Sequence, residues 1–324
     1  MVNGAPGSAW ASLTSAGGIE EVVVAGAPAH DDPTRLTEEH LFDLASLTKI
    51  FTTVTALRLV DDGSIDLDGP VVSVLPVGSG RDAETITLRH LLTHTSGLPA
   101  EGRLWRTGMR GEQLRDAVLG SALLSRPGDT HRYSDLGFIA IGELLERVSG
   151  RRLDALVGET AARIGAEWLT WTPDAARAVA TEVQPHRGLV RGEVHDELAA
   201  ALERPAGHAG LFGTVHDVAA LARVVRDDGV GAGGRVLSPE SARLLREPVV
   251  QADGFEQAVG LRVRDANWMG RADAVGHTGF TGTAFAVSPR TGDYGVLLLN
   301  RVNPTREDAD ASAARRSFFA FLAA

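Results

Sequence analysis

Two residues with the chemistry of a nucleophile and a base stand three positions apart in the segment Ser46-Leu47-Thr48-Lys49. Lys49 is the only lysine of the 324-residue chain, because every other member of its 32 lysines and arginines is an arginine. A guanidinium keeps its proton in a protein, whereas a lysine amine can lose its proton once it is removed from water. The pattern therefore predicts that Lys49 accepts the proton of Ser46, which then acts as a nucleophile.

A compositional origin is the alternative explanation of this pair. Ser-x-x-Lys recurs by chance in ordinary proteins, and a chain that avoids lysine almost completely can retain one without a function. We favour the catalytic interpretation, because serine fills only about one position in twenty of a typical chain, so that a chance placement three residues before the only lysine is improbable.

Length and composition exclude several classes of protein. The net charge of -10 and the absence of a basic run argue against a nucleic-acid or anionic-membrane partner. Without cysteine there is no disulfide, thiolate zinc site or cysteine nucleophile. The first residues lack the charged start and apolar run of a signal peptide, and no stretch reaches the roughly 20 apolar residues of a membrane span. The sequence as given therefore predicts a cytoplasmic protein.

Periodic patterns indicate where the elements lie. Apolar residues recur every three or four positions from Leu47 to Val60, which predicts a helix with Ser46 and Lys49 at its N-terminal turn, where the helix dipole is positive and burial would lower the pKa of the amine. Further helices are predicted at 88–93, 112–124, 136–148, 152–164 and 215–226, with another opened by Ser238-Pro239. Strands are predicted at 21–26, 258–263, 283–287 and 294–300.

This order of elements predicts an α+β fold, an α/β sandwich with an antiparallel sheet. Residues 1–65 and 208–324 form the subdomain that carries the sheet, and residues 66–207 form an inserted, mainly helical subdomain. We expect the active site between the two subdomains.

Two further segments complete the candidate site, and with them a resemblance appears. Tyr133-Ser134-Asp135 precedes a predicted helix, and His277-Thr278-Gly279 precedes a predicted strand pair. Together with Ser46 to Lys49, they resemble in order and spacing the Ser-x-x-Lys, Tyr-x-Asn and Lys-Thr-Gly elements of the serine β-lactamase and penicillin-binding-protein superfamily, on its class C and esterase-like side. The flanking segments 90–99, 207–212 and 276–282 are similar to the same superfamily.

The resemblance implies a β-lactamase/transpeptidase-like fold and a covalent mechanism. Ser46 attacks a carbonyl carbon, Lys49 and Tyr133 share its proton, and Tyr133 passes a proton to the leaving group. The backbone N–H groups of Ser46 and Phe280 form the oxyanion hole, and water then releases the acyl group. Such a site needs no metal and no cofactor.

One alternative concerns the tyrosine element. Class A enzymes of the superfamily carry Ser-Asp-Asn at this place, and Ser134-Asp135 imitates its first two residues. We favour Tyr133, because the flanking residues from Arg132 to Gly137 resemble the tyrosine-bearing branch.

Two departures from the superfamily pattern bear on the substrate, which would contact Asp135, His277, Thr278 and Gly279. His277 replaces the lysine of Lys-Thr-Gly, and Asp135 replaces the asparagine of Tyr-x-Asn. A histidine is at most partly charged near pH 7, and an ionised aspartate cannot donate a hydrogen bond. Both changes weaken the attraction for a substrate carboxylate, although His277 would be protonated if it paired with Asp135.

Other patterns are weaker. Gly229 to Gly234 has dinucleotide-binding spacing but follows a helical pattern instead of a strand, so we expect a turn. His90 and His94 have the spacing of helical zinc ligands, but the usual glutamate is absent, and we expect them to support loops. No Gly-x-Ser-x-Gly nucleophile elbow occurs.

The sequence therefore predicts a serine hydrolase that forms an acyl-enzyme on Ser46, most readily an esterase or amidase for a small acyl substrate. A β-lactamase, a D-amino-acid peptidase and a biosynthetic acyl transferase use the same machinery and remain alternatives. A non-catalytic binding module of the same fold is a further alternative, against which intact Ser46, Lys49 and Tyr133 speak.

Overall fold

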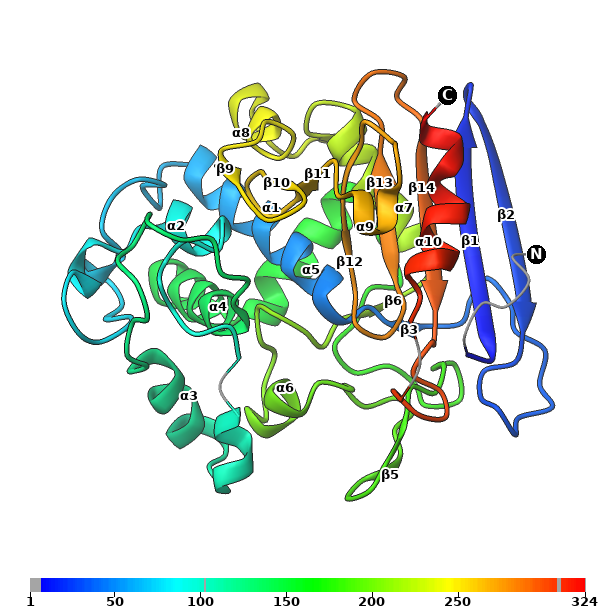
Figure 1. Ribbon diagram of the computed structural model, residues 1–324, viewed down its shortest axis with the longest axis horizontal. Helices are drawn as coiled ribbons and strands as arrows, with labels where there is room; N and C mark the ends of the chain where they lie inside the picture. The colour runs from blue at the N-terminus through cyan, green and yellow to red at the C-terminus, as the bar shows by residue number, and fades with distance from the viewer. Residues whose placement is uncertain (1–6, 102, 308–309, 324) are drawn as a thin grey trace.

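An eight-stranded antiparallel sheet lies at the centre of the protein, described here from a computed structural model (Figure 1). The structure describes residues 7–101, 103–307 and 310–323. In spatial order the strands are β2 (Ile19–Gly26), β1 (Ala9–Ala16), β14 (Tyr294–Leu299), β13 (Ala284–Val287), β12 (Val275–Thr278), β11 (Arg262–Val263), β10 (Glu256–Gln257) and β9 (Val250–Gln251). An antiparallel sheet flanked by helices agrees with the predicted α+β class.

Strand β1 lies between a strand near the beginning of the described chain and a strand near its end. It pairs with β2 on one side and with β14 on the other, in a register that places Trp10 opposite Leu299 and Ser15 opposite Tyr294. Our sequence analysis did not predict β1, because its small and hydroxylated residues lack a strong apolar alternation.

The helices of the described residues are α1 (Thr48–Asp61), α2 (Leu88–Leu92), α3 (Gly111–Leu119), α4 (Asp135–Ser149), α5 (Leu153–Ile164), α6 (Glu197–Ala201), α7 (Val215–Arg226), α8 (Pro239–Leu244), α9 (Ala266–Met269) and α10 (Ser312–Phe319). Some of them cover the two faces of the sheet. Helix α7 packs on β1, β13 and β14, whereas α10 packs on the other face and lies in front of the sheet in Figure 1.

Burial on both faces explains why β14 is a continuous apolar run. Val296 and Leu298 belong to the large core shared with α1 and α7, and Leu297 and Leu299 belong to a second core formed with α9 and α10. All six residues of the strand are buried. A half-exposed strand would instead alternate apolar and polar residues.

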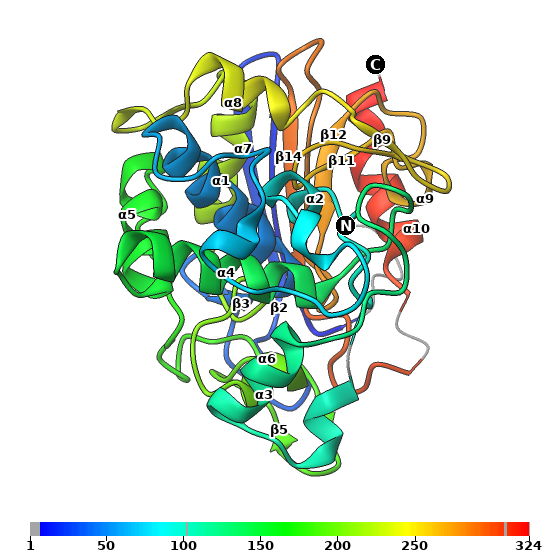
Figure 2. The ribbon, with the colours of Figure 1, turned by 90° about the vertical axis from the view of Figure 1, so that its left-hand side faces the viewer.

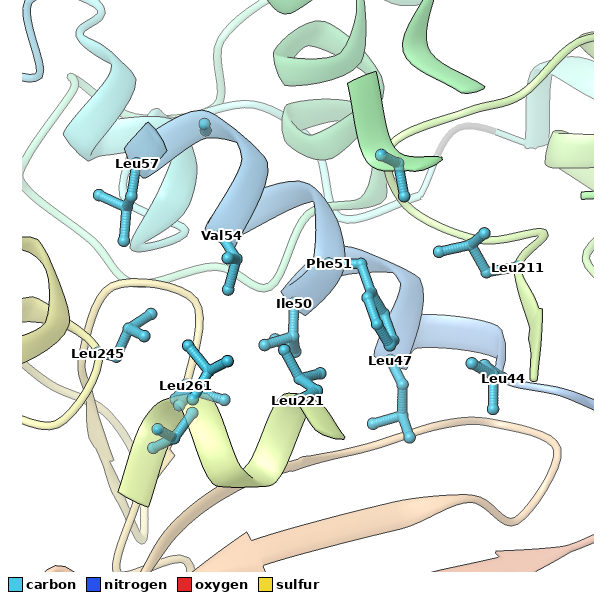
Figure 3. Packing of buried hydrophobic residues seen from close by; sticks show 14 of the residues in the cluster. Leu44, Leu47, Ile50, Phe51, Val54, Leu57, Leu211, Leu221, Leu245 and Leu261 are labelled. Atoms are coloured by element: carbon cyan, nitrogen blue, oxygen red, sulfur yellow. The ribbon is translucent and has the colours of Figure 1, made fainter. Parts of the chain in front are cut away.

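Helix α1 runs through the interior of the protein. The first ten of its fourteen residues are buried, and Figure 3 shows Ile50, Phe51 and Val54 packed among side chains of neighbouring elements. Two buried threonines of α1 donate to carbonyls of the preceding helical turn: Thr53 Oγ1 donates to the Lys49 carbonyl at 2.8 Å, and Thr55 Oγ1 donates to the Phe51 carbonyl at 2.8 Å. The helix predicted from the apolar period between Leu47 and Val60 is therefore enclosed on all sides over most of its length.

The segment 66–207 is mainly helical and lies away from the β1–β2 hairpin (Figures 1 and 2). It contributes α2 to α6 and one short hairpin of β4 (Val183–Gln184) and β5 (Gly188–Leu189). The division into subdomains at residues 65 and 208 stays a prediction. Residues 1–6 and 324, which we assigned to the sheet-bearing subdomain, lie outside the described residues, as do the first positions of the segment searched for a signal peptide.

Two small ladders complete the fold. Strands β3 (Phe42–Asp43) and β6 (Phe212–Gly213) pair next to the start of α1, and β7 (Val230–Gly231) and β8 (Gly234–Arg235) form the turn expected at the glycine-rich segment. Some predicted boundaries differ. Helix α3 ends at Leu119 instead of residue 124, and His277 and Thr278 lie within β12 instead of before a strand pair.

Phe51→Ala tests the contribution of the enclosed helix. Phe51 is fully buried, so truncation removes apolar contacts and leaves a cavity, and we expect the free energy of unfolding to fall by about 3–5 kcal/mol. Urea denaturation followed by circular dichroism measures this loss. The control Val72→Ala, at a side chain that is 41% exposed, is expected to change the same quantity by less than about 0.5 kcal/mol.

Candidate active site

Ser46 and Lys49 lie on one face of the turn that opens α1. Ser46 belongs to a 3₁₀ turn, Ala45–Leu47, that leads directly into the helix, and Lys49 occupies the first helical turn. Lys49 Nζ lies 3.0 Å from Ser46 Oγ, within hydrogen-bond distance. Ser46 is half-buried and reachable, whereas Lys49 is completely buried. This geometry suits an amine that acts on a serine hydroxyl.

Two other segments bind the same amine. Lys49 Nζ donates to the His208 carbonyl at 3.0 Å and forms an ion pair with Asp135 Oδ1 at 2.7 Å. The Nζ atom also lies 5.0 Å from the centroid of the Tyr133 ring. The three donors of an ammonium therefore face the Ser46 hydroxyl, a carbonyl oxygen and a carboxylate, which is a complete set of acceptors.

The pKa of Lys49 differs from our expectation. Burial acts to lower the pKa of Lys49, as predicted, but the charge of Asp135, and then that of Tyr133, outweigh burial and raise the pKa above its ordinary value. From the sequence, we expected desolvation alone to act on the pKa of Lys49, and we expected Asp135 to contact the substrate. The prediction that burial leaves a neutral amine is therefore wrong, because Asp135 supplies a counter-charge in direct contact.

Tyr133 stands beside this amine at the end of the loop before α4. Its half-buried ring lies 4.4 Å from the ring of His94 and 6.0 Å from the ring of His277, measured between centroids. Tyr133 contributes, after Asp135, to the raised pKa of Lys49. The structure thus brings Ser46, Lys49 and Tyr133 together, as the spacing of the motifs predicted.

Ser134 has a structural role at the start of α4. It is the N-cap of α4, since its Oγ accepts the Gly137 N–H at 3.1 Å and donates to the Pro99 carbonyl at 2.6 Å. The side chain is buried, and its hydroxyl is occupied by these two bonds to the backbone. This geometry favours Tyr133 over Ser134 as the chemically active residue of the segment.

The turn between β12 and β13 approaches the turn that carries Ser46. A Cβ atom added at Gly279 would lie 2.1 Å from Thr283 Oγ1 and 2.6 Å from the Leu44 carbonyl oxygen, so no side chain fits there. Thr281 Oγ1 donates to the Asp43 carbonyl at 2.7 Å, and Thr283 Oγ1 donates to the Leu44 carbonyl at 3.0 Å. Thr278, Gly279 and Phe280 are therefore held beside Ser46.

His277 is neutral in this environment. Burial, followed by the charges of Arg262 and Lys49, holds the pKa of His277 well below its ordinary value. Its Nδ1 lies 2.8 Å from the Thr278 carbonyl, which only accepts, so Nδ1 carries the ring proton. In the part of the chain that the structure describes, the ion pair of Asp135 is formed with Lys49 and not with His277. The alternative of a protonated His277 paired with Asp135 is therefore not supported.

Several further residues shape the site, of which His94 was expected to support a loop, whereas His208 and Arg262 were not among the predicted site residues. His94 Nδ1 accepts the Ser134 N–H at 3.0 Å, and burial, followed by the charge of Lys49, holds the pKa of His94 well below its usual range. His208, whose carbonyl binds Lys49, places its Nε2 3.0 Å from Asp196 Oδ1. Arg262 lies 5.5 Å from the Tyr133 ring centroid and pairs with Asp265. Only the tertiary structure brings these distant segments to Lys49.

The histidines with zinc-like spacing have structural contacts. His90 is part of the capping box that begins α2, and His94 supports the loop of Tyr133. Among residues 7–101, 103–307 and 310–323, no three side chains of the metal-binding types gather at one place.

Comparison with known proteins now identifies the family. The sequence profile described as Beta-lactamase matches residues 10–318. The chain belongs to the Beta-lactamase family. The resemblance inferred from the motifs is thereby confirmed, and the protein is a serine hydrolase related to the β-lactamases.

Two relatives are similar to this chain over most of its length. A putative D-alanyl-D-alanine carboxypeptidase of Escherichia coli (strain K12) is 27% identical over 316 residues, which cover 85% of this chain and 72% of the relative. An N-acetylmuramyl-L-alanine amidase of Bacillus subtilis (strain 168) is 28% identical over 316 residues, which cover 84% of this chain and 70% of the relative.

Solved structures confirm the β-lactamase/transpeptidase-like fold. EstCE1, described as a hydrolase with promiscuous acyltransferase activity, superposes with a TM-score of 0.80 at 21% identity, over 98% of this chain and 94% of its own. A class C β-lactamase from Rhodobacter sphaeroides superposes with a TM-score of 0.75 at 20% identity, over 97% and 94% of the two chains. Within the described residues of this family member, no helix has the length and apolar character needed to cross a membrane.

Asp135→Asn tests the ion pair of Lys49. Removing the carboxylate charge disfavours the Lys49 ammonium, so the pKa of Lys49 is expected to fall by about 1–3 units. Because the ammonium is the working form of Lys49, the falling limb of kcat/KM against pH for a nitrophenyl ester then moves to lower pH. The control Asp68→Asn, at an exposed partner of Arg89, leaves the limb in place. If the limb does not move in Asp135→Asn, the ion pair of Lys49 with Asp135 does not control the pH dependence of activity.

Proposed function

We propose that this enzyme hydrolyses small esters or amides through a covalent acyl-enzyme on Ser46. The contact that carries the proposal is the 3.0 Å approach of the buried Lys49 amine to the half-buried Ser46 hydroxyl, with the centroid of the Tyr133 ring 5.0 Å from the same amine. Membership in a family of serine hydrolases supports the same role for Ser46.

The acylation step begins at Ser46. Its Oγ forms a bond to the carbonyl carbon while its proton passes to the Tyr133 oxygen, and the developing oxyanion is bound by the N–H groups of Ser46 and Phe280. The Lys49 ammonium, held by Asp135, stabilises negative charge on the Tyr133 and Ser46 oxygens. The bond to the leaving group then breaks, and Tyr133 returns the proton to the departing alcohol or amine.

Deacylation regenerates the serine. A water molecule gives one proton to Tyr133 and attacks the acyl carbon, and the Ser46 oxygen leaves and recovers its proton. The products are the free carboxylic acid and the original enzyme, so that one water molecule is consumed for each substrate and no redox partner is needed.

The charges around Ser46 favour a substrate without a carboxylate. The Lys49 ammonium is already neutralised by Asp135, His277 is neutral, and the Arg262 guanidinium is paired with the buried Asp265 at 2.9 Å. A substrate carboxylate would therefore find no unpaired cation among these groups. A neutral ester or amide does not need such a cation for binding.

We also propose that the site lies between two subdomains. Ser46 and Lys49 come from α1, and His277 to Phe280 come from the sheet. Tyr133 and Asp135 come from the loop and helix of the helical segment, so the reacting bond would be enclosed from both sides.

A second candidate is a β-lactamase or a peptidase that removes D-alanine. The relatives in Escherichia coli and Bacillus subtilis favour it, because they are described as a D-alanyl-D-alanine carboxypeptidase and an N-acetylmuramyl-L-alanine amidase. A biosynthetic acyl transferase is supported by EstCE1, which is described as having promiscuous acyltransferase activity. A non-catalytic module is disfavoured by the intact contacts of Lys49.

A panel of substrates separates these functions. We expect the enzyme to turn over a nitrophenyl butyrate ester and a fluorophosphonate to label Ser46. For a chromogenic cephalosporin we expect kcat/KM to be at least about 100-fold lower than for the ester. The variant Ser46→Ala is expected to lose all three signals. Spectrophotometry and peptide mass spectrometry measure these outcomes.

Other outcomes of the panel point elsewhere. Faster cephalosporin than ester turnover would support a β-lactamase, and release of D-alanine from a D-alanyl-D-alanine peptide would support a peptidase. Labelling of Ser46 without hydrolysis of any substrate would support a transferase that awaits its acceptor. A wild-type protein that is neither labelled nor active would contradict the catalytic proposal.

His277→Lys tests the charge argument directly. A lysine there adds a cation at the position of the family's Lys-Thr-Gly lysine, so the ratio of cephalosporin to ester kcat/KM is expected to rise about tenfold, equivalent to about 1.4 kcal/mol. The control His277→Gln keeps the site neutral and should leave the ratio nearly unchanged. Equal ratios in the two variants would show that charge at residue 277 does not select the substrate.

A further inference from the structure

A buried carboxylate three residues before Ser46 has no part in the mechanism above. Asp43 lies in β3, and only 2% of its surface is exposed. Its Oδ1 accepts the Ala45 N–H at 2.8 Å, and its Oδ2 accepts the His195 N–H at 2.7 Å. Burial raises the pKa of Asp43, while these backbone hydrogen bonds act to lower it. A buried carboxylate is costly, which raises the question of what Asp43 does there.

The first link of Asp43 concerns the backbone conformation before the nucleophile. Ala45 has a φ of 46°, in the left-handed region that a residue with a Cβ rarely adopts. Such a conformation costs on the order of 1–2 kcal/mol and persists only where its surroundings impose it. Asp43 Oδ1 holds the N–H of Ala45, which fixes the direction in which the next peptide group, and with it the Ser46 N–H, points.

The second link leads to the opposite side of the site. The His195 N–H binds Asp43 Oδ2, and the His195 ring stacks on the Phe280 ring with centroids 5.6 Å apart and an angle of 23° between the planes. His195 is held in turn by Glu182, whose Oε2 lies 2.9 Å from its Nε2. Asp43 therefore supports the residue against which Phe280 packs.

The third link uses the backbone of the same residue. The Asp43 carbonyl accepts the Thr281 hydroxyl at 2.7 Å, directly after Phe280 in the chain. Three oxygen atoms of Asp43 thus bind three segments: the turn that carries Ser46, the turn that carries Phe280, and the loop of His195.

We propose that Asp43 is a positioning residue that sets the distance and the relative orientation of the Ser46 and Phe280 N–H groups. The inference rests on the proposed role of Ser46 and its oxyanion hole. Two donors stabilise an oxyanion only where both reach the same oxygen, and an error of about 1 Å can cost on the order of 100-fold in rate. Asp43 and Thr281 fix that geometry without touching the substrate.

Asp43→Asn is the first test. An asparagine keeps the size of the side chain but replaces one acceptor by an N–H donor, which would face either Ala45 N–H or His195 N–H. For the folded variant, we expect kcat for a nitrophenyl ester to fall on the order of 100-fold, with less than about threefold change in KM. We expect the affinity for phenylboronic acid, which forms a tetrahedral adduct with a serine, to fall by at least about tenfold.

Thr281 provides a test that leaves the buried carboxylate in place. Thr281→Val removes the hydroxyl that binds the Asp43 carbonyl, whereas Thr281→Ser retains it. We expect the valine variant to lose kcat and boronate affinity together, and the serine variant to recover most of both. The matched control Thr160→Val removes a buried hydroxyl that binds Thr55 and Arg58, so it should lower stability without changing either quantity.

The outcomes distinguish failure of this inference from failure of the proposed function. If the fluorophosphonate does not label Ser46 in the wild-type enzyme, the proposed nucleophile is wrong. If Ser46 is labelled but folded Asp43→Asn and Thr281→Val keep wild-type kcat and boronate affinity, the positioning role is wrong. If Asp43→Asn does not fold, the comparison of Thr281→Val with Thr281→Ser decides.

Discussion

The contact between Lys49 and Asp135 is the interaction on which the candidate site depends. An ammonium group without exposure to water is tolerated only where acceptors and an opposite charge surround it. Those acceptors come from Ser46 at the start of α1, Asp135 at the start of α4, and the carbonyl of His208 in a third segment. One buried charge therefore joins three distant parts of the chain, and the position of each part is fixed by the same nitrogen atom.

This arrangement also determines the electrostatic character of the site. In a chain that otherwise uses arginine for positive charge, the single lysine lies where a compact ammonium fits among three acceptors and a planar guanidinium would not. The charge of Lys49 is balanced by Asp135, and burial, with a smaller contribution from the positive charges nearby, holds the pKa values of His94 and His277 well below their ordinary value. The result is a reaction centre with a strong local field and little net charge, which suits uncharged carbonyl compounds better than anions.

Local patterns predicted the elements of this fold better than they predicted the environment of the site. The apolar period from Leu47 to Val60 and the cap Ser238-Pro239 correspond to α1 and α8, because both signals act within one or two helical turns. Strand β1 was missed, since its pairing with β14 comes from the far end of the described chain. The direction of the pKa shift of Lys49 was also missed for a long-range reason: the spacing within Ser-x-x-Lys gives no sign of the carboxylate that α4 places against the amine.

The pairing of β1 with both β2 and β14 has a consequence for biosynthesis. During translation, β1 and β2 emerge before the other elements of the described chain and can form a hairpin, but two strands alone are only marginally stable in water. The other edge of β1 must wait until nearly all of the described chain has left the ribosome before β14 covers it. Throughout that interval the free edge of β1 presents unpaired backbone N–H and C=O groups and is prone to aggregation. The yield of folded protein in a cell should therefore depend on chaperones that shield the emerging hairpin.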